Sequence, residues 1–191
     1  MDTPEGSQTS NQQPTGGVFS NNDAKPQNRS HNEAANLVIG WREWVSLPEL
    51  GIPAIKAKID TGARTSAIHA FDIERIKKNG GEDWLAFRIQ PIQRDDSIIV
   101  RTEAPLVDVR TVTDSGGHKA DRYFIETLLE VGPYARRIEM TLTRRQDMLF
   151  RMLIGRTAMV PDIQIDPSKS FTLGRQSARS LYEDQITGAD S

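Results

Sequence analysis

The sequence predicts a mostly β protein, and two observations support that prediction. Over much of the chain, apolar residues alternate with polar ones at a period of two, which is typical of strands with one buried face. Polar segments rich in Gly, Asn and Asp separate these alternating runs and have the composition of turns. Many short strands joined by polar turns indicate an all-β barrel or sandwich.

The expected strands follow one another from residue 55 to residue 142. Their alternating apolar positions are Ile55, Ala57 and Ile59; Leu85, Phe87 and Ile89; Val107 and Val109; Tyr123 and Ile125; and Ile138, Met140 and Leu142. Turn segments lie at Asn79-Gly80-Gly81, Arg94-Asp95-Asp96, Asp114-Ser115-Gly116-Gly117 and Gly132-Pro133. Helix is scarce, and one short helix is expected from Arg156 to Met159.

Composition divides the chain into three parts. Residues 1–35 consist largely of Ser, Asn, Gln, Gly, Pro and Thr, so this segment has too little apolar surface to offset its ordering entropy and is expected to be a disordered polar tail. A folded domain is expected over residues 36–175, and a second polar tail over residues 176–191.

Charge and cysteine content exclude several classes of protein. The formal net charge is −2, from 24 basic and 26 acidic residues, so no general attraction to nucleic acid or membrane is expected. The chain has no cysteine, which excludes disulfides, a thiol nucleophile and cysteine-ligated zinc.

The sequence shows neither a secretory signal pattern nor an apolar run of about 18 residues, so a cytoplasmic protein is expected.

The strand ending at Ile59 leads into Asp60-Thr61-Gly62-Ala63, which carries the strongest chemical signal. Aspartic proteases activate water with two carboxylates about 3 Å apart that share one proton, because two like charges so close cannot both ionise. Each Asp must follow a buried strand at a turn. Gly62 would then allow a close backbone approach, Thr61 would supply a small hydroxyl to lock the paired loops, and Ala63 would line the cleft. An isolated Asp-Thr-Gly also occurs as an ordinary Asp turn, so the tripeptide alone is weak evidence for an aspartic protease.

A second element, Leu153-Ile154-Gly155-Arg156, makes the pattern specific, since retropepsins pass a hydrophobic-hydrophobic-Gly element, usually followed by Arg, behind the Asp loop. More narrowly, the chain resembles a bacterial family of retropepsin-like domains often labelled "ATP-dependent zinc protease". Members occur beside ATP-grasp ligases that add glutamate tails to a ribosomal protein. The matching segments are residues 56–70, Arg122-Tyr123-Phe124-Ile125, residues 138–145, Met148 and residues 152–156.

The resemblance implies a single-lobe, retropepsin-like acid-protease barrel with Asp60 as the catalytic residue and residues 107–127 as the flap hairpin. Viral retropepsins place an Asp after Asp-Thr-Gly-Ala to pair with the later Arg, whereas this chain has Arg64 there. We therefore expect Arg156 to pair with Asp72, Glu74 or Glu139. Arg64 would either bind an acidic substrate side chain at the cleft or make a surface ion pair.

A dyad needs a second aspartate, and the chain has only one Asp-Thr-Gly. Asp114-Ser115-Gly116 is the internal candidate, but a polar stretch precedes it and too few residues separate it from Asp60 for a complete lobe, so it fits a hairpin tip better. The expected enzyme is therefore a symmetric homodimer with Asp60 and its copy facing each other.

The chain has three histidines, His31, His69 and His118, but no His-Glu-x-x-His and no closely spaced ligand pair, so zinc catalysis is not expected. No phosphate-binding loop is present, so no cofactor is expected and ATP dependence would come from a partner ligase. The alternative to an endopeptidase is a non-catalytic peptide- or partner-binding module on the same barrel. The basic pairs Arg136-Arg137 and Arg144-Arg145 are more typical of solvated strand faces than of an RNA site.

Overall fold

The computed structural model describes residues 37–187 apart from 79, 114–116, 118 and 146–147, with side chains described as far as residue 182. The predicted tail over residues 1–35 lies outside the described residues, as do Asp114-Ser115-Gly116, His31 and His118. In order, the elements are β1 (Leu37–Gly40), β2 (Arg42–Leu47), η1 (Pro48–Leu50), β3 (Ile52–Ile59), β4 (Ser66–His69), β5 (Phe71–Lys77), β6 (Asp83–Ile89), β7 (Val100–Thr113), β8 (Lys119–Val131), β9 (Tyr134–Thr143), β10 (Met152–Ile154), η2 (Arg156–Ala158), β11 (Ile163–Asp166) and α1 (Ala178–Thr187).

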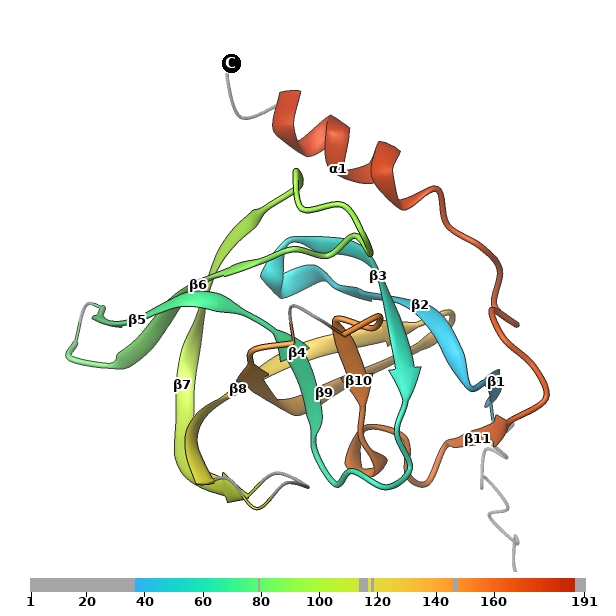
Figure 1. Cartoon of the computed structure of the whole chain (residues 1–191), viewed down its shortest axis with the longest axis horizontal. Coiled ribbons are helices and arrows are strands. Elements are labelled where there is room, and N and C mark those ends of the chain that lie inside the picture. The colour runs from blue at the N-terminus through green and yellow to red at the C-terminus, as the bar shows by residue number, and fades with distance from the viewer. Residues whose placement is uncertain (1–36, 79, 114–116, 118, 146–147, 188–191) are drawn as a thin grey trace, which may run out of the picture. The chain divides into compact units, whose positions relative to one another are not determined.

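The main sheet of the described chain has nine strands in the order β2-β3-β10-β4-β9-β8-β7-β6-β5 (Figure 1). An additional pairing joins β2 to β8 through Ser46 and Glu130, so the six strands from β2 to β8 in this order close into a barrel. The strands β7, β6 and β5 continue the sheet beyond β8, while β1 and β11 form a separate parallel pair. The predicted mostly β, single-lobe barrel is therefore confirmed.

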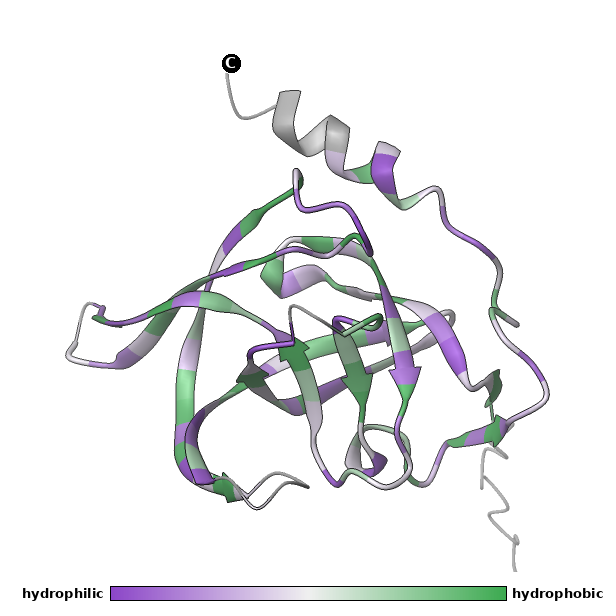
Figure 2. Ribbon diagram, in the orientation of Figure 1, coloured by the Kyte–Doolittle hydropathy of each residue, from purple (hydrophilic) through white to green (hydrophobic). Residues whose placement is uncertain are grey.

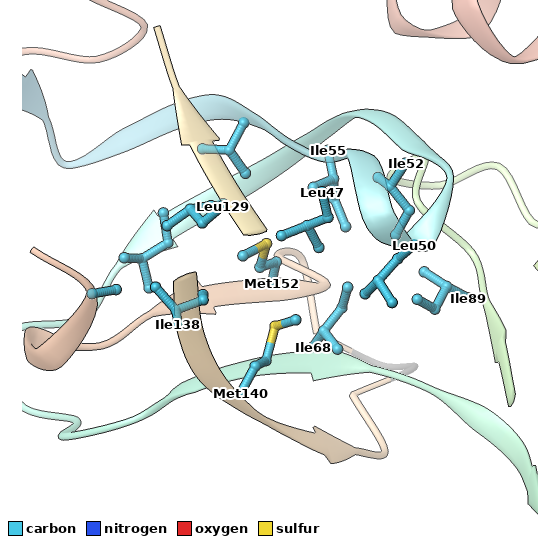
Figure 3. Packing of buried hydrophobic residues seen from close by; sticks show 14 of the residues in the cluster. Leu47, Leu50, Ile52, Ile55, Ile68, Ile89, Leu129, Ile138, Met140 and Met152 are labelled. Atoms are coloured by element: carbon cyan, nitrogen blue, oxygen red, sulfur yellow. The ribbon is translucent and has the colours of Figure 1, made fainter. Parts of the chain in front are cut away.

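The barrel interior is filled by aliphatic side chains from strands far apart in the sequence. Hydrophilic and hydrophobic residues alternate along much of the sheet (Figure 2), and strands such as β2 supply the core from one face, whereas β4 is buried throughout. The side chains in Figure 3 belong to this cluster, in which Ile52, Ile55, Ile68, Met140 and Met152 are 0% exposed. Each such side chain stabilises the fold by about 1.5–3 kcal/mol relative to an exposed one.

The hairpin formed by β7 and β8 differs from the simple alternation expected there. Val107 and Val109 are 49% and 40% exposed, whereas Leu106 is half-buried. The register between β7 and β8 shifts between Leu106 and Asp108. A bulge inserts an extra residue and bends the strand, so a two-residue period no longer reports a single face beyond it.

The end of the described chain also differs from the prediction of a polar tail over residues 176–191, because Ala178–Thr187 form the helix α1. Tyr182 is 1% exposed, and its hydroxyl donates a hydrogen bond to the carbonyl oxygen of Ala54 on β3 at 2.6 Å. Arg179 pairs with Asp95 at 2.9 Å. The buried Ala178 and Tyr182 thus anchor this otherwise polar segment on the barrel.

A buried carboxylate fastens the segment before α1 to the strands at the start of the domain. Glu43 on β2 is 0% exposed, and it accepts hydrogen bonds from the backbone N–H groups of Gly40 at 2.7 Å and Thr172 at 2.9 Å. The Thr172 hydroxyl adds a third bond at 2.7 Å. Buried carboxylates are tolerated only when their oxygens are satisfied in this way, so Glu43 fixes the path of residues 170–173 over the barrel.

In the part of the chain that is described, no helix is both long enough and apolar enough to cross a membrane.

Candidate active-site loop

The strand β10 lies between β3 and β4, although β3 and β4 are consecutive in the sequence (Figure 1). It pairs in parallel with β3, placing Ile154 beside Ile59, and antiparallel with β4, placing Leu153 beside Ala67. The loop that connects β3 to β4 must therefore pass around the end of β10. This topology brings Asp60-Thr61-Gly62 and Leu153-Ile154-Gly155, which are distant in the sequence, into direct contact.

The Asp60 side chain is oriented by the backbone of its own loop. Its backbone N–H donates to the Ile154 carbonyl oxygen at 2.9 Å, which fixes Asp60 at the end of β3. The N–H groups of Gly62 and Ala63 lie 3.1 and 3.3 Å from Asp60 Oδ1. One carboxylate oxygen is thus held by the loop, while Oδ2 has no hydrogen-bond partner within the described residues.

Gly155 packs against the far side of the same loop. A Cβ atom at this position would lie 2.5 Å from the Thr65 carbonyl carbon and 2.7 Å from the Arg64 oxygen, so only glycine fits without moving the backbone. The Gly155 N–H donates to the Ser66 hydroxyl at 3.1 Å, and the Arg156 N–H donates to the Ala63 carbonyl at 2.9 Å. These contacts hold the loop from behind.

The Arg156 guanidinium binds backbone carbonyls and none of the carboxylates expected for it. Its Nη1 donates to the oxygens of Thr61 at 2.7 Å and Gly62 at 3.0 Å. Two of the three expected partners are engaged elsewhere: Asp72 pairs with Arg88 at 2.9 Å, and Glu139 pairs with Arg110 at 2.7 Å. The expectation was wrong because a guanidinium is a fork of donors that two adjacent carbonyls can satisfy as well as a carboxylate can.

Arg64, the residue expected at the cleft, is exposed and makes no ion pair within the described residues. Its carbonyl oxygen accepts hydrogen bonds from the N–H group and the hydroxyl of Thr157, at 3.1 and 3.0 Å. Its backbone is therefore fixed by η2, while its side chain extends from the surface of the Asp60 loop.

A groove of about 440 Å³ lies where β5, β8 and β9 meet. Its walls come from the start of β5, the half of β8 that follows the hairpin turn, and the end of β9. Besides small and apolar residues, they carry Phe71, Asp72, Asp121, Arg122, Tyr123 and Arg144. The sequence placed Asp121, Arg122 and Tyr123 in the expected flap hairpin. It gave no sign that they share a groove with Phe71 and Arg144, because the groove joins three segments that are remote in the sequence.

Arg145 directly follows the groove residue Arg144 and interacts electrostatically with Asp60. The residue is half-buried, and burial lowers the pKa of its guanidinium, while the negative charge of Asp60 opposes that shift and the positive charge of Arg122 adds to it. Asp60 and Arg122 are therefore both close enough to Arg145 to act on it electrostatically. Arg122, Arg144 and Arg145 bring positive charge to this part of the molecule, and Asp72 and Asp121 in the groove walls bring negative charge.

His69, the one histidine within the described residues, has a structural position. It is 1% exposed, its Nδ1 accepts a hydrogen bond from the Arg145 N–H at 3.0 Å, and its ring stacks on Phe71. Burial lowers the pKa of the imidazole, and the charge of Arg151 adds to this. Within the described residues, no group of three or more His, Cys, Asp or Glu side chains is placed to hold a metal ion.

The strands β7 and β8 pair antiparallel as far as Thr113 and Lys119, so residues 107–127 do form a hairpin. Its turn falls on residues that are mostly outside the described ones. In Figure 1 the ends of β7 and β8 nearest this turn lie toward the same edge of the domain as the β3–β4 loop.

A closed β barrel with a strand inserted between the two strands that flank an Asp-Thr-Gly loop defines a retropepsin-like domain. The chain belongs to the RimB-like family, described as "Retropepsin-like aspartic endopeptidase RimB", whose match covers residues 38–176.

Curated relatives of the chain carry a different name. A "Probable alpha-L-glutamate ligase" from Shewanella halifaxensis is 46% identical over 155 residues, which are 81% of this chain and 33% of that protein. A protein of the same name from Parasynechococcus marenigrum is 41% identical over 150 residues, covering 78% of this chain and 31% of that protein. The chain thus spans about a third of the length of these relatives.

Among solved structures, the crystal structure of Lpg0085, a protein of unknown function from Legionella pneumophila, is similar to the chain with a TM-score of 0.62 and 25% sequence identity. The match covers 73% of this chain and 99% of that one.

Proposed function

We propose that the chain is an aspartic endopeptidase whose active site is completed by a second copy of itself. The observation that carries this proposal is the geometry of Asp60, with Oδ1 held by two backbone N–H groups and Oδ2 left without a partner in the described chain. Each chain supplies one such aspartate, and a two-fold axis beside the loop would bring two of them together.

In the proposed reaction, one Asp60 carboxylate acts as the base and its protonated copy as the acid. The base removes a proton from a water molecule as the water oxygen attacks the peptide carbonyl carbon, and the acid gives its proton to the carbonyl oxygen. The resulting tetrahedral diol breaks its C–N bond as the protonated Asp60 gives its proton to the leaving nitrogen. At the same time, the other Asp60 carboxylate takes a proton from one diol hydroxyl, whose oxygen becomes the new carbonyl oxygen. The products are a carboxylic acid and an amine, and the dyad again holds a single shared proton.

The neighbouring residues would shape the site. Thr61 and Gly62 would meet their copies across the axis, Ala63 and Arg64 would border the substrate cleft, and Leu153, Ile154, Gly155 and Arg156 would hold the loop in place. The β7–β8 hairpin would close over the bound polypeptide.

The proposed substrate is a glutamate-rich polypeptide. Arg122 and Arg144 line the groove together with Asp72 and Asp121, and Asp72 is already paired with Arg88. Arg145 interacts electrostatically with Asp60, and Arg64 is exposed on the Asp60 loop itself. Guanidinium groups recognise carboxylates with strong, directional hydrogen bonds, so this distribution favours acidic side chains. The curated relatives, named as glutamate ligases, also connect such domains with glutamate chemistry. We accordingly propose that the protein acts in the cytoplasm with an ATP-grasp ligase as its partner.

The test compares the wild-type chain with Asp60→Asn, which is nearly isosteric but cannot act as the base. Both are incubated from about pH 4 to pH 8 with an unstructured protein and with a glutamate-tailed peptide, and the products are identified by mass spectrometry. Cleavage by the wild-type chain alone supports the proposal, and cut sites next to glutamate support the acidic substrate. Equal cleavage by both chains would exclude Asp60 as the catalytic residue.

The second candidate is a non-catalytic module that binds a peptide or a ligase partner on the same barrel. The names of the curated relatives favour it, since they describe ligases and no peptidase. A binding module would retain its affinity for the glutamate-tailed peptide in the Asp60→Asn variant while neither chain cleaved it.

A further inference from the structure

The outward side of β2 and β3 carries a group of basic and aromatic side chains. In this antiparallel pair Arg42 lies opposite Lys58 and Trp44 lies opposite Lys56, while the alternate residues of β2, such as Glu43 and Val45, point inward and are buried. Trp41 next to β2, and two residues from the segment before α1, complete the group. We call it the cation–aromatic face: Trp41, Arg42, Trp44, Lys56, Lys58, Phe171 and Arg175.

The cations of this face lie over its aromatic rings. The Arg42 guanidinium carbon is 4.5 Å from the centroid of the Trp41 ring and 4.9 Å from that of Phe171. Lys56 Nζ lies 4.9 Å from the Trp44 ring, and the Arg175 guanidinium carbon lies 5.8 Å from the Phe171 ring. Such contacts orient the side chains and leave their positive charge uncompensated.

No carboxylate neutralises the face within the described residues, because Arg42, Lys56, Lys58 and Arg175 make no ion pair there. The buried Arg42 Nε also has no hydrogen-bond partner in this part of the chain. The face ends at the next outward position of β2, where the Ser46 hydroxyl donates to Glu130 at 2.6 Å. Four unpaired cations are thus concentrated on one side of a protein whose net charge is −2.

We propose that the cation–aromatic face binds single-stranded RNA. Lysine and arginine side chains would contact the phosphates, while bases would stack on the partly exposed indole and guanidinium planes, the combination that such sites use. An acidic polypeptide would satisfy the four cations but would gain nothing from three aromatic rings. The flat strand pair carries no helix that could enter a duplex groove, so single strands fit it better.

This inference departs from the expectation that the chain has no nucleic-acid partner. That expectation rested on the net charge of −2 and on basic residues adjacent in the sequence. Of these residues, Arg136 is engaged with Asp162, and Arg137 with Glu49 and Glu126. The cation–aromatic face instead draws residues from β2, β3 and the segment 171–175, which only the fold brings together. It also does not depend on the peptidase activity proposed for Asp60.

The test measures binding of a fluorescein-labelled oligouridylate of about 12 nucleotides by anisotropy over a series of salt concentrations. The Lys56→Gln/Lys58→Gln chain should bind at least about tenfold more weakly at low salt, with a salt slope smaller by about 1.4, because two phosphate contacts are lost. The matched control, Arg101→Gln/Lys119→Gln, removes two exposed cations from β7 and β8 and should bind like the wild type. Equal weakening in both variants would mean that overall charge is responsible and would overturn the proposal.

Tryptophan fluorescence gives a second readout that a purely electrostatic effect would not produce. Two of the three tryptophans, Trp41 and Trp44, belong to the face, whereas Trp84 lies on β6 beneath Lys78. Oligouridylate should quench the fluorescence of the Trp84→Phe chain but quench the Trp41→Phe/Trp44→Phe chain, whose one tryptophan is Trp84, much less. An unlabelled oligoglutamate peptide that displaced the RNA equally well, with the same dependence on Lys56 and Lys58, would identify an acidic polypeptide as the partner instead and would also overturn the proposal.

Discussion

At the scale of single residues, the position of the Asp60 loop depends on Gly155 having no side chain. Gly155 allows β10 to end directly against the backbone of Arg64 and Thr65, and from there the next residue reaches the carbonyls of Thr61 and Gly62. The Asp60 carboxylate is held mostly by backbone groups, so its orientation follows from the path of the loop.

Gly155→Ala is therefore expected to disturb both stability and the site. Its Cβ atom would lie 2.5 Å from the Thr65 carbonyl carbon, so the backbone must shift, at a cost of about 1–3 kcal/mol in the free energy of unfolding. Urea unfolding would measure this cost. The rate of peptide cleavage by the variant should fall by more than the loss of folded protein accounts for.

The control for Gly155→Ala is Thr157→Ala, which removes only the exposed hydroxyl contact with the Arg64 carbonyl. That change should cost no more than about 1 kcal/mol. If both variants unfolded at the wild-type urea concentration, the close approach at Gly155 would not be important for stability.

At the scale of elements, some features could be predicted from the sequence and others could not. The alternation in β3, β6 and β9 predicted strands because one face of each lies in the core. It failed in β7, where Val107 and Val109 are exposed and the register shifts at a bulge between Leu106 and Asp108. The helix α1 was not predicted because a polar segment of this composition becomes ordered only through contacts with β3. The local sequence pattern carries no information about those contacts.

The contribution of α1 can be tested at Tyr182. Tyr182→Ala should lower the free energy of unfolding by about 3–5 kcal/mol, the range for removing a large buried aromatic side chain. Tyr182→Phe removes only the hydroxyl bond to the Ala54 carbonyl and should cost about 1 kcal/mol. Leu181→Ala is the control, since Leu181 is 36% exposed, and its effect should be small. Thermal unfolding with no change in Tyr182→Ala would show that α1 does not stabilise the barrel.

At the scale of the whole molecule, the fold positions residues that no local motif connects. The Asp-Thr-Gly motif and the Leu-Ile-Gly-Arg element could be paired from the sequence because their resemblance to retropepsins includes both. The groove that holds Arg122 and Arg144 could not be predicted from the sequence, since it exists only where β5, β8 and β9 meet. The partners of Arg156 could not be predicted from the sequence either, because they are backbone carbonyls, which no residue type identifies.

The proposed dyad makes a prediction that only a two-chain site explains. When a fixed amount of wild-type chain is mixed with an increasing excess of Asp60→Asn and allowed to exchange subunits, most wild-type chains enter mixed dimers that have a single Asp60. Cleavage should therefore fall toward zero, and the rate should follow the fraction of wild-type pairs. Adding the folded variant Arg101→Gln in the same excess is the control, and it should not reduce the rate. A rate that stayed constant with added Asp60→Asn would assign catalysis to a single chain, and the homodimeric mechanism would have to be abandoned.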